Sequence, residues 1–128
     1  MNFSTTINCM DGRVQLPVIK YLQQRFGAEN VDSITAAGPN RILAEQKDEA
    51  VIHSLLKRVD ISINAHKSPA LAVTGHHDCA GNPVGKQEQL EHIRAAVRFL
   101  KKRYPQIQII GLWVNEDWKV EEIETGDV

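Results

Sequence analysis

Residues 70–81 of the chain read ALAVTGHHDCAG. The first four of these residues are apolar, as is typical of a parallel strand that is covered on both of its faces. His76 and Cys79 then stand three residues apart at the end of this predicted strand, so both side chains can point at one ion. Imidazole and thiolate are ligands that Zn²⁺ prefers in proteins, and the stretch therefore predicts half of a zinc site.

Residues 7–13 read INCMDGR and have the same organisation. An apolar predicted strand ends at Cys9, and Asp11 and Arg13 follow at alternate positions. The chain contains only two cysteines, and both come at the end of a predicted strand. The two stretches together therefore predict one metal site.

Cys9, His76 and Cys79 supply three candidate ligands for this site, with water or Asp11 as the fourth. Asp11 and Arg13 are two residues apart on a predicted tight turn, and they could form a bidentate ion pair. Such a pair would hold the carboxylate off the metal, and breaking it would free Asp11 to become a ligand.

Apolar periodicity predicts alternating strands and helices along the chain. Gly38, Pro39 and Asn40 predict a turn, and residues 118–123 predict a short antiparallel edge strand. The alternation predicts an α/β fold with a parallel sheet of about four strands, helices on both faces and this C-terminal edge strand. The predicted parallel strands are 5–10, 32–37, 70–74 and 107–114, and the predicted helices are 16–26, about 45–65, and 90–103.

Two further expectations follow from this arrangement. If the first and third strands are neighbours, Cys9 and Cys79 can meet beyond their carboxyl ends, where α/β sheets place their sites. Residues 35–38 are Thr-Ala-Ala-Gly, and side chains this small would allow another backbone segment to approach closely.

The overall composition limits the class of protein. A length of 128 residues predicts a single domain over 1–128. The net charge of −1 gives no reason to expect a nucleic-acid or anionic-membrane partner. No apolar run approaches the roughly 20 residues that cross a bilayer. The N-terminal residues lack the pattern of a signal peptide, so we expect a cytoplasmic protein whose two cysteines are ligands or reactive thiols.

The two motifs resemble the signatures of the β-class carbonic anhydrases. Those signatures are Cys-x-Asp-x-Arg and Gly-His-x-x-Cys-x-Gly, and the order of the predicted elements is similar to that family over most of the chain. The matching residues are Cys9, Asp11 and Arg13 for the first signature, and Gly75, His76, Cys79 and Gly81 for the second.

The resemblance implies a function and a set of site residues. It implies a zinc lyase that converts carbon dioxide reversibly to bicarbonate through zinc-bound hydroxide, and that works as a homodimer or a larger homo-oligomer. In this interpretation Cys9, His76 and Cys79 are the zinc ligands. Asp11 and Arg13 are the catalytic gating pair.

The sequence also departs from the family pattern. Gly12 stands where family members usually have serine, and residues 35–38 stand where they usually have Arg-Asn-Ala-Gly. The first predicted strand begins almost at Met1, so we expect no N-terminal helical arm of the kind that embraces the partner subunit in that family. These departures bear on the substrate pocket and on the usual dimer, whereas the metal ligands are retained.

Three alternatives remain at this point. Asp11 could close a structural zinc site permanently, without turnover. The same metal centre could act on another small linear substrate, such as carbon disulfide. Cys9 and Cys79 could instead form a thiol switch. Outside the site, we expect His77 and Asp78 to be exposed loop residues and Trp118 to pack at the edge of the sheet.

Overall fold

The computed structural model describes residues 2–126 and contains one five-stranded sheet with strand order β2-β1-β3-β4-β5. Four strands are parallel, and the last pairs antiparallel with β4. The predicted α/β fold with an antiparallel C-terminal edge strand is therefore confirmed. The strands are β1 (Phe3–Cys9), β2 (Asn30–Ala36), β3 (Ala70–His76), β4 (Gln108–Val114) and β5 (Val120–Ile123).

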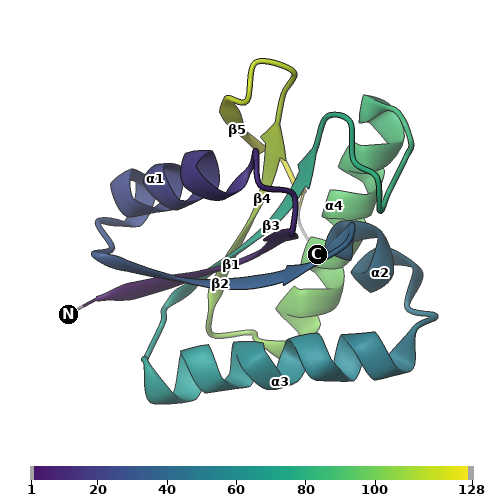
Figure 1. Cartoon of the computed structure of the whole chain (residues 1–128). Coiled ribbons are helices and arrows are strands. Elements are labelled where there is room, and N and C mark those ends of the chain that lie inside the picture. The colour runs from purple at the N-terminus through teal and green to yellow at the C-terminus, as the bar shows by residue number, and fades with distance from the viewer. Residues whose placement is uncertain (1, 127–128) are drawn as a thin grey trace.

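The helices cover both faces of the sheet, as predicted. Figure 1 shows α1 (Gln15–Phe26) on one side of β1 and β2 and the long α3 (Glu49–Ala65) on the other. The short α2 (Pro39–Glu45) and α4 (Lys86–Arg103) pack on the same side as α3, because their apolar residues join one buried cluster. Within residues 2–126, no helix is both long and apolar enough to cross a membrane.

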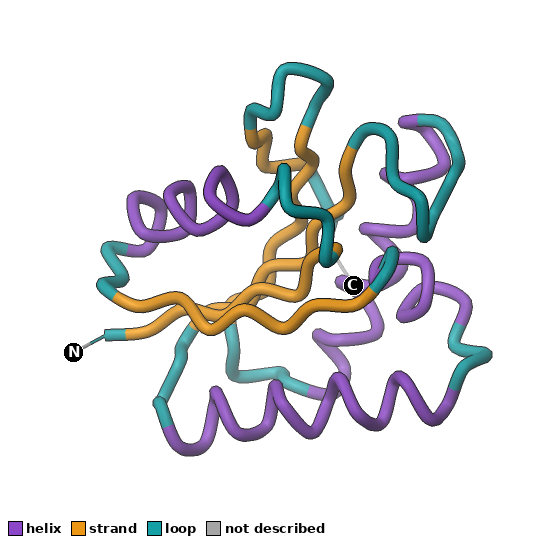
Figure 2. Tube along the Cα trace, in the orientation of Figure 1, coloured by secondary structure: helices purple, strands orange, loops and turns teal. Residues whose placement is uncertain are grey.

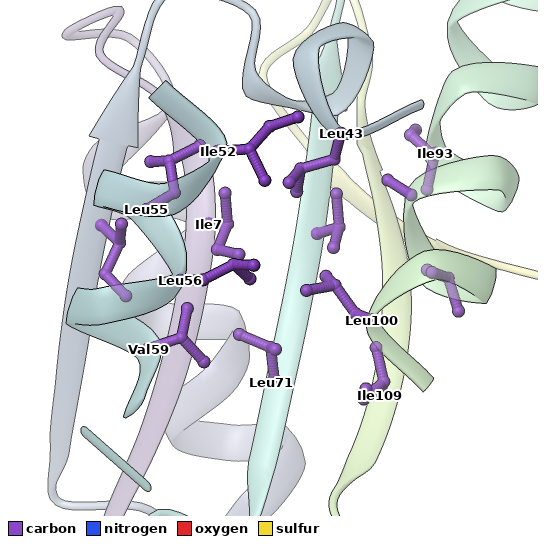
Figure 3. Close-up of a cluster of buried hydrophobic side chains, with 14 of the residues drawn as sticks. Ile7, Leu43, Ile52, Leu55, Leu56, Val59, Leu71, Ile93, Leu100 and Ile109 are labelled. Atoms are coloured by element: carbon purple, nitrogen blue, oxygen red, sulfur yellow. The ribbon is translucent and has the colours of Figure 1, made fainter. Parts of the chain in front are cut away.

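The larger apolar cluster fills the space between the sheet and the helices α2, α3 and α4 (Figure 3). Ile7 and Leu71 from the sheet face Leu55 and Leu100 from the helices, and all four side chains are at most 1% exposed. Burying each side chain of this size stabilises the fold by roughly 1.5–3 kcal/mol. Every residue of β3 is buried, which confirms that this strand is covered on both faces.

The predicted turn at Gly38, Pro39 and Asn40 and the predicted start of the next helix near residue 45 are both wrong. The chain forms a separate helix, α2, after Gly38, which has a left-handed backbone with φ of 59°. Proline suits the first turn of a helix because a backbone N–H at that position would have no partner within the helix, so nothing is lost when it is absent. The next helix begins only after Asp48, whose carboxylate accepts a hydrogen bond from the Val51 backbone N–H at 3.2 Å.

The predicted edge strand is also too long at its start. β5 begins at Val120, and Trp118 lies in the preceding turn with a left-handed backbone, φ 60°. A residue in that conformation cannot continue a strand. Trp118 still packs against the second apolar cluster, between α1 and the sheet, but its ring also faces the candidate site described below.

The sheet opens at the point where the strand order reverses. The β1–β2 pairing runs to Cys9 and the β3–β4 pairing runs to His76, whereas the β1–β3 pairing ends at Ile7 and Val73. The carboxyl ends of β1 and β3 therefore separate beyond this pair. Figure 2 shows the loops that follow β1 and β3, and the β4–β5 hairpin, at the same end of the sheet.

Candidate metal centre

Cys9, His76 and Cys79 meet at the opening between β1 and β3. One ligand atom from each residue lies within 4.8 Å of the others, and the two sulfur atoms are 3.8 Å apart. All three side chains are buried. The expectation that neighbouring first and third strands bring the two cysteines together is confirmed, and this group could hold a metal ion.

A backbone contact fixes which nitrogen of His76 faces the sulfur atoms. Nδ1 of His76 lies 2.7 Å from the carbonyl oxygen of His77. Because a carbonyl can only accept, Nδ1 carries the proton and donates, which leaves Nε2 as the atom with a free lone pair. Nε2 is buried and has no hydrogen-bond partner among the described residues. A buried, unpaired imidazole nitrogen of this tautomer is what a metal ligand requires.

The two thiols do not lose their protons independently. The pKa of Cys9 is lowered chiefly because Cys79 donates a hydrogen bond to the Cys9 thiolate, and the neighbouring His76 lowers it further. The pKa of Cys79 is raised by that same hydrogen bond, by burial, and by the negative charge of Cys9. Burial opposes the charged form of His76, but the neighbouring Cys9 thiolate and the hydrogen bond to the His77 carbonyl outweigh burial and raise the pKa of His76.

These shifts predict that metal affinity falls as the pH is lowered. Metal binding requires both thiolates and a neutral imidazole, so a bound metal must displace the proton that the raised pKa retains on Cys79. We expect at least about one proton released per zinc bound near pH 7. Calorimetric titration in buffers of different ionisation enthalpy measures this number, and an affinity that stays constant between about pH 6 and 8 would contradict it.

Asp11 lies outside the group of three and pairs with Arg13. The guanidinium donates from Nη2 to Oδ2 at 2.6 Å and from Nε to Oδ1 at 3.0 Å, and the Arg13 backbone N–H donates to Oδ1 at 2.9 Å. These hydrogen bonds lower the pKa of Asp11 to about 2, so the carboxylate is ionised at neutral pH. The predicted bidentate pair is present in this structure.

Gln15 holds the loop that carries Asp11 and Arg13 through side-chain hydrogen bonds, a role that the sequence did not predict. Its side-chain amide donates to the carbonyl oxygens of Cys9 and Asp11, both at 2.8 Å. Its carbonyl oxygen accepts a hydrogen bond from the buried Asn8 at 3.0 Å. A glutamine in the first turn of a helix is common, and only the folded loop shows what this side chain contacts.

Close backbone packing around Gly81 explains why the second motif ends in glycine. A Cβ atom there would lie 2.5 Å from the Ala37 carbonyl carbon and 2.7 Å from the Gly38 backbone nitrogen. The small residues at 35–38 therefore receive the backbone of the Cys79 loop, as predicted. Neither neighbouring atom belongs to a side chain that could rotate away.

Gly81→Ala is expected to lower the melting temperature and to weaken metal binding, because the Cys79 loop must move away from Ala37. Overpacking of this kind typically costs about 1–3 kcal/mol. Gly85→Ala is the matched control, because a Cβ atom at Gly85 meets nothing within 4 Å. Thermal denaturation and zinc titration of both variants check this, and equal behaviour of the two would refute the packing explanation.

A pocket of about 420 Å³ lies beside the candidate metal ligands. Its walls combine the charged groups of the Asp11–Arg13 pair with small and apolar side chains from the loop after β3. The residues that line it are Asp11, Arg13, Asp78, Cys79, Ala80, Pro83 and Val84. The pocket is large enough for a small molecule next to the sulfur of Cys79.

Comparison with known proteins relates this fold and site to one family. The family model described as "Putative carbonic anhydrase" matches residues 1–124. No curated protein sequence compared with the chain matches it.

Solved structures share the fold at low sequence identity. The β-carbonic anhydrase CafD of Aspergillus fumigatus has a TM-score of 0.65 at 11% identity, over 97% of this chain and 90% of that one. A carbonic anhydrase from Glaciozyma antarctica has a TM-score of 0.57 at 17% identity, over 94% and 81%. A tetrameric β-carbonic anhydrase from Sordaria macrospora has a TM-score of 0.57 at 12% identity, over 99% and 82%. The match of the family model over nearly the whole chain shows that this protein belongs to the carbonic anhydrase family.

Proposed function

We propose that the protein is a zinc-dependent lyase that hydrates carbon dioxide reversibly to bicarbonate. The observation that carries this proposal is the buried group of Cys9, His76 and Cys79, whose ligand atoms lie within 4.8 Å of one another, while Nε2 of His76 has no hydrogen-bond partner among the described residues. These residues would hold the zinc. Thiolate and imidazole are the donors that zinc favours, and bound zinc would supply an activated water for attack on the substrate.

The chain's own residues would contribute positioning and hydrogen bonding. Asp11 is ionised and fixed by three hydrogen bonds from Arg13, so it offers a carboxylate oxygen of constant orientation at the mouth of the site. Such an oxygen can accept a hydrogen bond from a donor group in the pocket, but it cannot donate one itself. Pro83 and Val84 give the pocket an apolar wall that suits a small nonpolar substrate.

We also propose a homodimer or a larger homo-oligomer. Met10 and Leu16, which are close in the sequence to Cys9 and Asp11, are each 65% exposed and offer apolar surface for a subunit contact. One structural relative, from Sordaria macrospora, is described as tetrameric.

Both cysteines are free thiols, which is consistent with a cytoplasmic location, where thiols stay reduced.

Stopped-flow measurement of carbon dioxide hydration tests the proposal. The protein is first shown to hold about one zinc per chain, and a Cys79→Ala variant serves as the blank. Hydration above that blank at alkaline pH supports the proposal. A fully zinc-loaded protein that never exceeds the blank would contradict it, and would favour a structural zinc site or another small linear substrate.

A further inference from the structure

Arg13 is held by more than its pairing with Asp11. Its Nη1 donates to the Asp78 carboxylate at 3.2 Å, and its Nη2 donates to the Asp78 backbone carbonyl at 3.1 Å. The guanidinium carbon also lies 4.3 Å from the centre of the Trp118 ring. Arg13 therefore joins three segments of the chain. It belongs to the loop after β1, and it contacts both the loop after β3 and the β4–β5 hairpin.

The backbone is strained where these contacts are made. Asp78 and Trp118 have φ values of 56° and 60°, a conformation that costs a residue with a side chain about 1 kcal/mol or more. Asn115 enforces this conformation at the hairpin, because its side-chain oxygen accepts from the backbone N–H groups of Asp117 and Lys119 at 2.9 and 3.1 Å. The Trp118 backbone N–H donates to the Asn115 carbonyl at 2.9 Å. These hydrogen bonds hold the turn in the conformation that places the indole ring beside Arg13.

The Asp11–Arg13 pair needs this support. The Arg13 side chain is 45% exposed, and an ion pair so open to water is worth little by itself. An aromatic ring that stacks on the guanidinium limits the positions Arg13 can take, and contributes its own cation–π attraction. Since Arg13 is what keeps Asp11 bonded away from the sulfur atoms, the ring contact bears on where Asp11 goes.

We propose that Trp118 is a positioning residue that holds Arg13 against Asp11 and so keeps the Asp11 carboxylate off the metal. This inference rests on the proposed metal centre and deepens it, because it assigns a determinant of the Asp11 gate to the β4–β5 hairpin. Without the indole ring, Arg13 keeps only hydrogen bonds to Asp11 and Asp78 that are open to water, and it leaves Asp11 more often. Asp11 then loses its partner and becomes available as a fourth ligand to the metal held by Cys9, His76 and Cys79.

The rate of zinc transfer from the loaded protein to a chromophoric chelator tests this directly. In Trp118→Ala, Asp11 is expected to bind the metal as a fourth ligand and so to slow its release. We therefore expect zinc transfer about three- to tenfold slower than in the wild type. Trp118→Phe keeps an aromatic face under Arg13 and is expected to restore most of the wild-type rate. In an Asp11→Asn background, Trp118→Ala is expected to leave the rate unchanged.

The controls separate positioning from packing. Phe26→Ala removes another half-buried ring of the same apolar cluster, which lies 4.8 Å from the Arg25 guanidinium, and is expected not to slow zinc transfer. A purely structural role for Trp118 predicts faster zinc loss and a lower melting temperature in Trp118→Ala. Faster or unchanged transfer in that variant overturns the inference. Absence of hydration in the wild-type protein overturns only the proposed function, because the transfer rate does not depend on turnover.

Discussion

Asp11→Asn is expected to reduce the rate of carbon dioxide hydration by about a hundredfold or more while the zinc content stays unchanged. Asparagine keeps the size of the side chain and one oxygen, but it lacks the negative charge that makes Asp11 a strong acceptor and a bidentate partner of Arg13. The change lies outside the group of three candidate ligands, so metal binding should survive it.

Stopped-flow hydration on zinc-loaded protein, with zinc measured in the same samples, checks this prediction. Asp117→Asn in the exposed β4–β5 turn removes the same charge away from the pocket and is expected to behave as the wild type. If Asp11→Asn and Asp117→Asn turn over equally well, Asp11 has no part in the reaction.

His76→Ala is expected to weaken zinc binding by about a hundredfold or more, whereas His77→Ala is expected to leave it near the wild-type value. Structural zinc sites bind with about 10–16 kcal/mol in total, so one ligand of three or four accounts for several kcal/mol. His76 is buried beside both sulfur atoms, whereas His77 is exposed and contributes its backbone carbonyl, which an alanine keeps.

Competition with a chelator of known zinc affinity measures both constants. Zinc should also raise the melting temperature of the wild type and of His77→Ala, because a ligand that binds only the folded state stabilises it. Equal losses of affinity in the two variants would mean that His76 contributes no more to zinc binding than His77, and would contradict the assignment of Nε2 of His76 as a ligand.

Most of the fold could be predicted from the sequence because its signals are local. The apolar run of β3 and the periodic apolar residues of α3 are strong enough to identify the elements and their alternation, which in turn restricts the topology. The region around Pro39 could not be predicted well, because Gly-Pro-Asn is equally suited to a turn and to a helix start. Burial of Leu43, a contact made only in the folded chain, favours the helix.

The candidate site was predictable in part for the same reason. Cys9, His76 and Cys79 stand at strand ends, and parallel strands deliver their ends to one edge of the sheet, so their meeting follows from topology. The contacts of Gln15 and Trp118 depend on loop conformations that no local pattern specifies. The left-handed backbone of Trp118 in particular has no sequence signal, because tryptophan rarely adopts it.

Zinc X-ray absorption spectroscopy on the loaded protein tests the metal centre most directly, because every functional proposal above depends on it. If Cys9, His76 and Cys79 hold the metal, the spectrum will show two sulfur neighbours at about 2.3 Å and imidazole nitrogen at about 2.0 Å, with one further light atom. A zinc ion surrounded only by oxygen and nitrogen would mean that the cysteines are not its ligands, and would contradict the account.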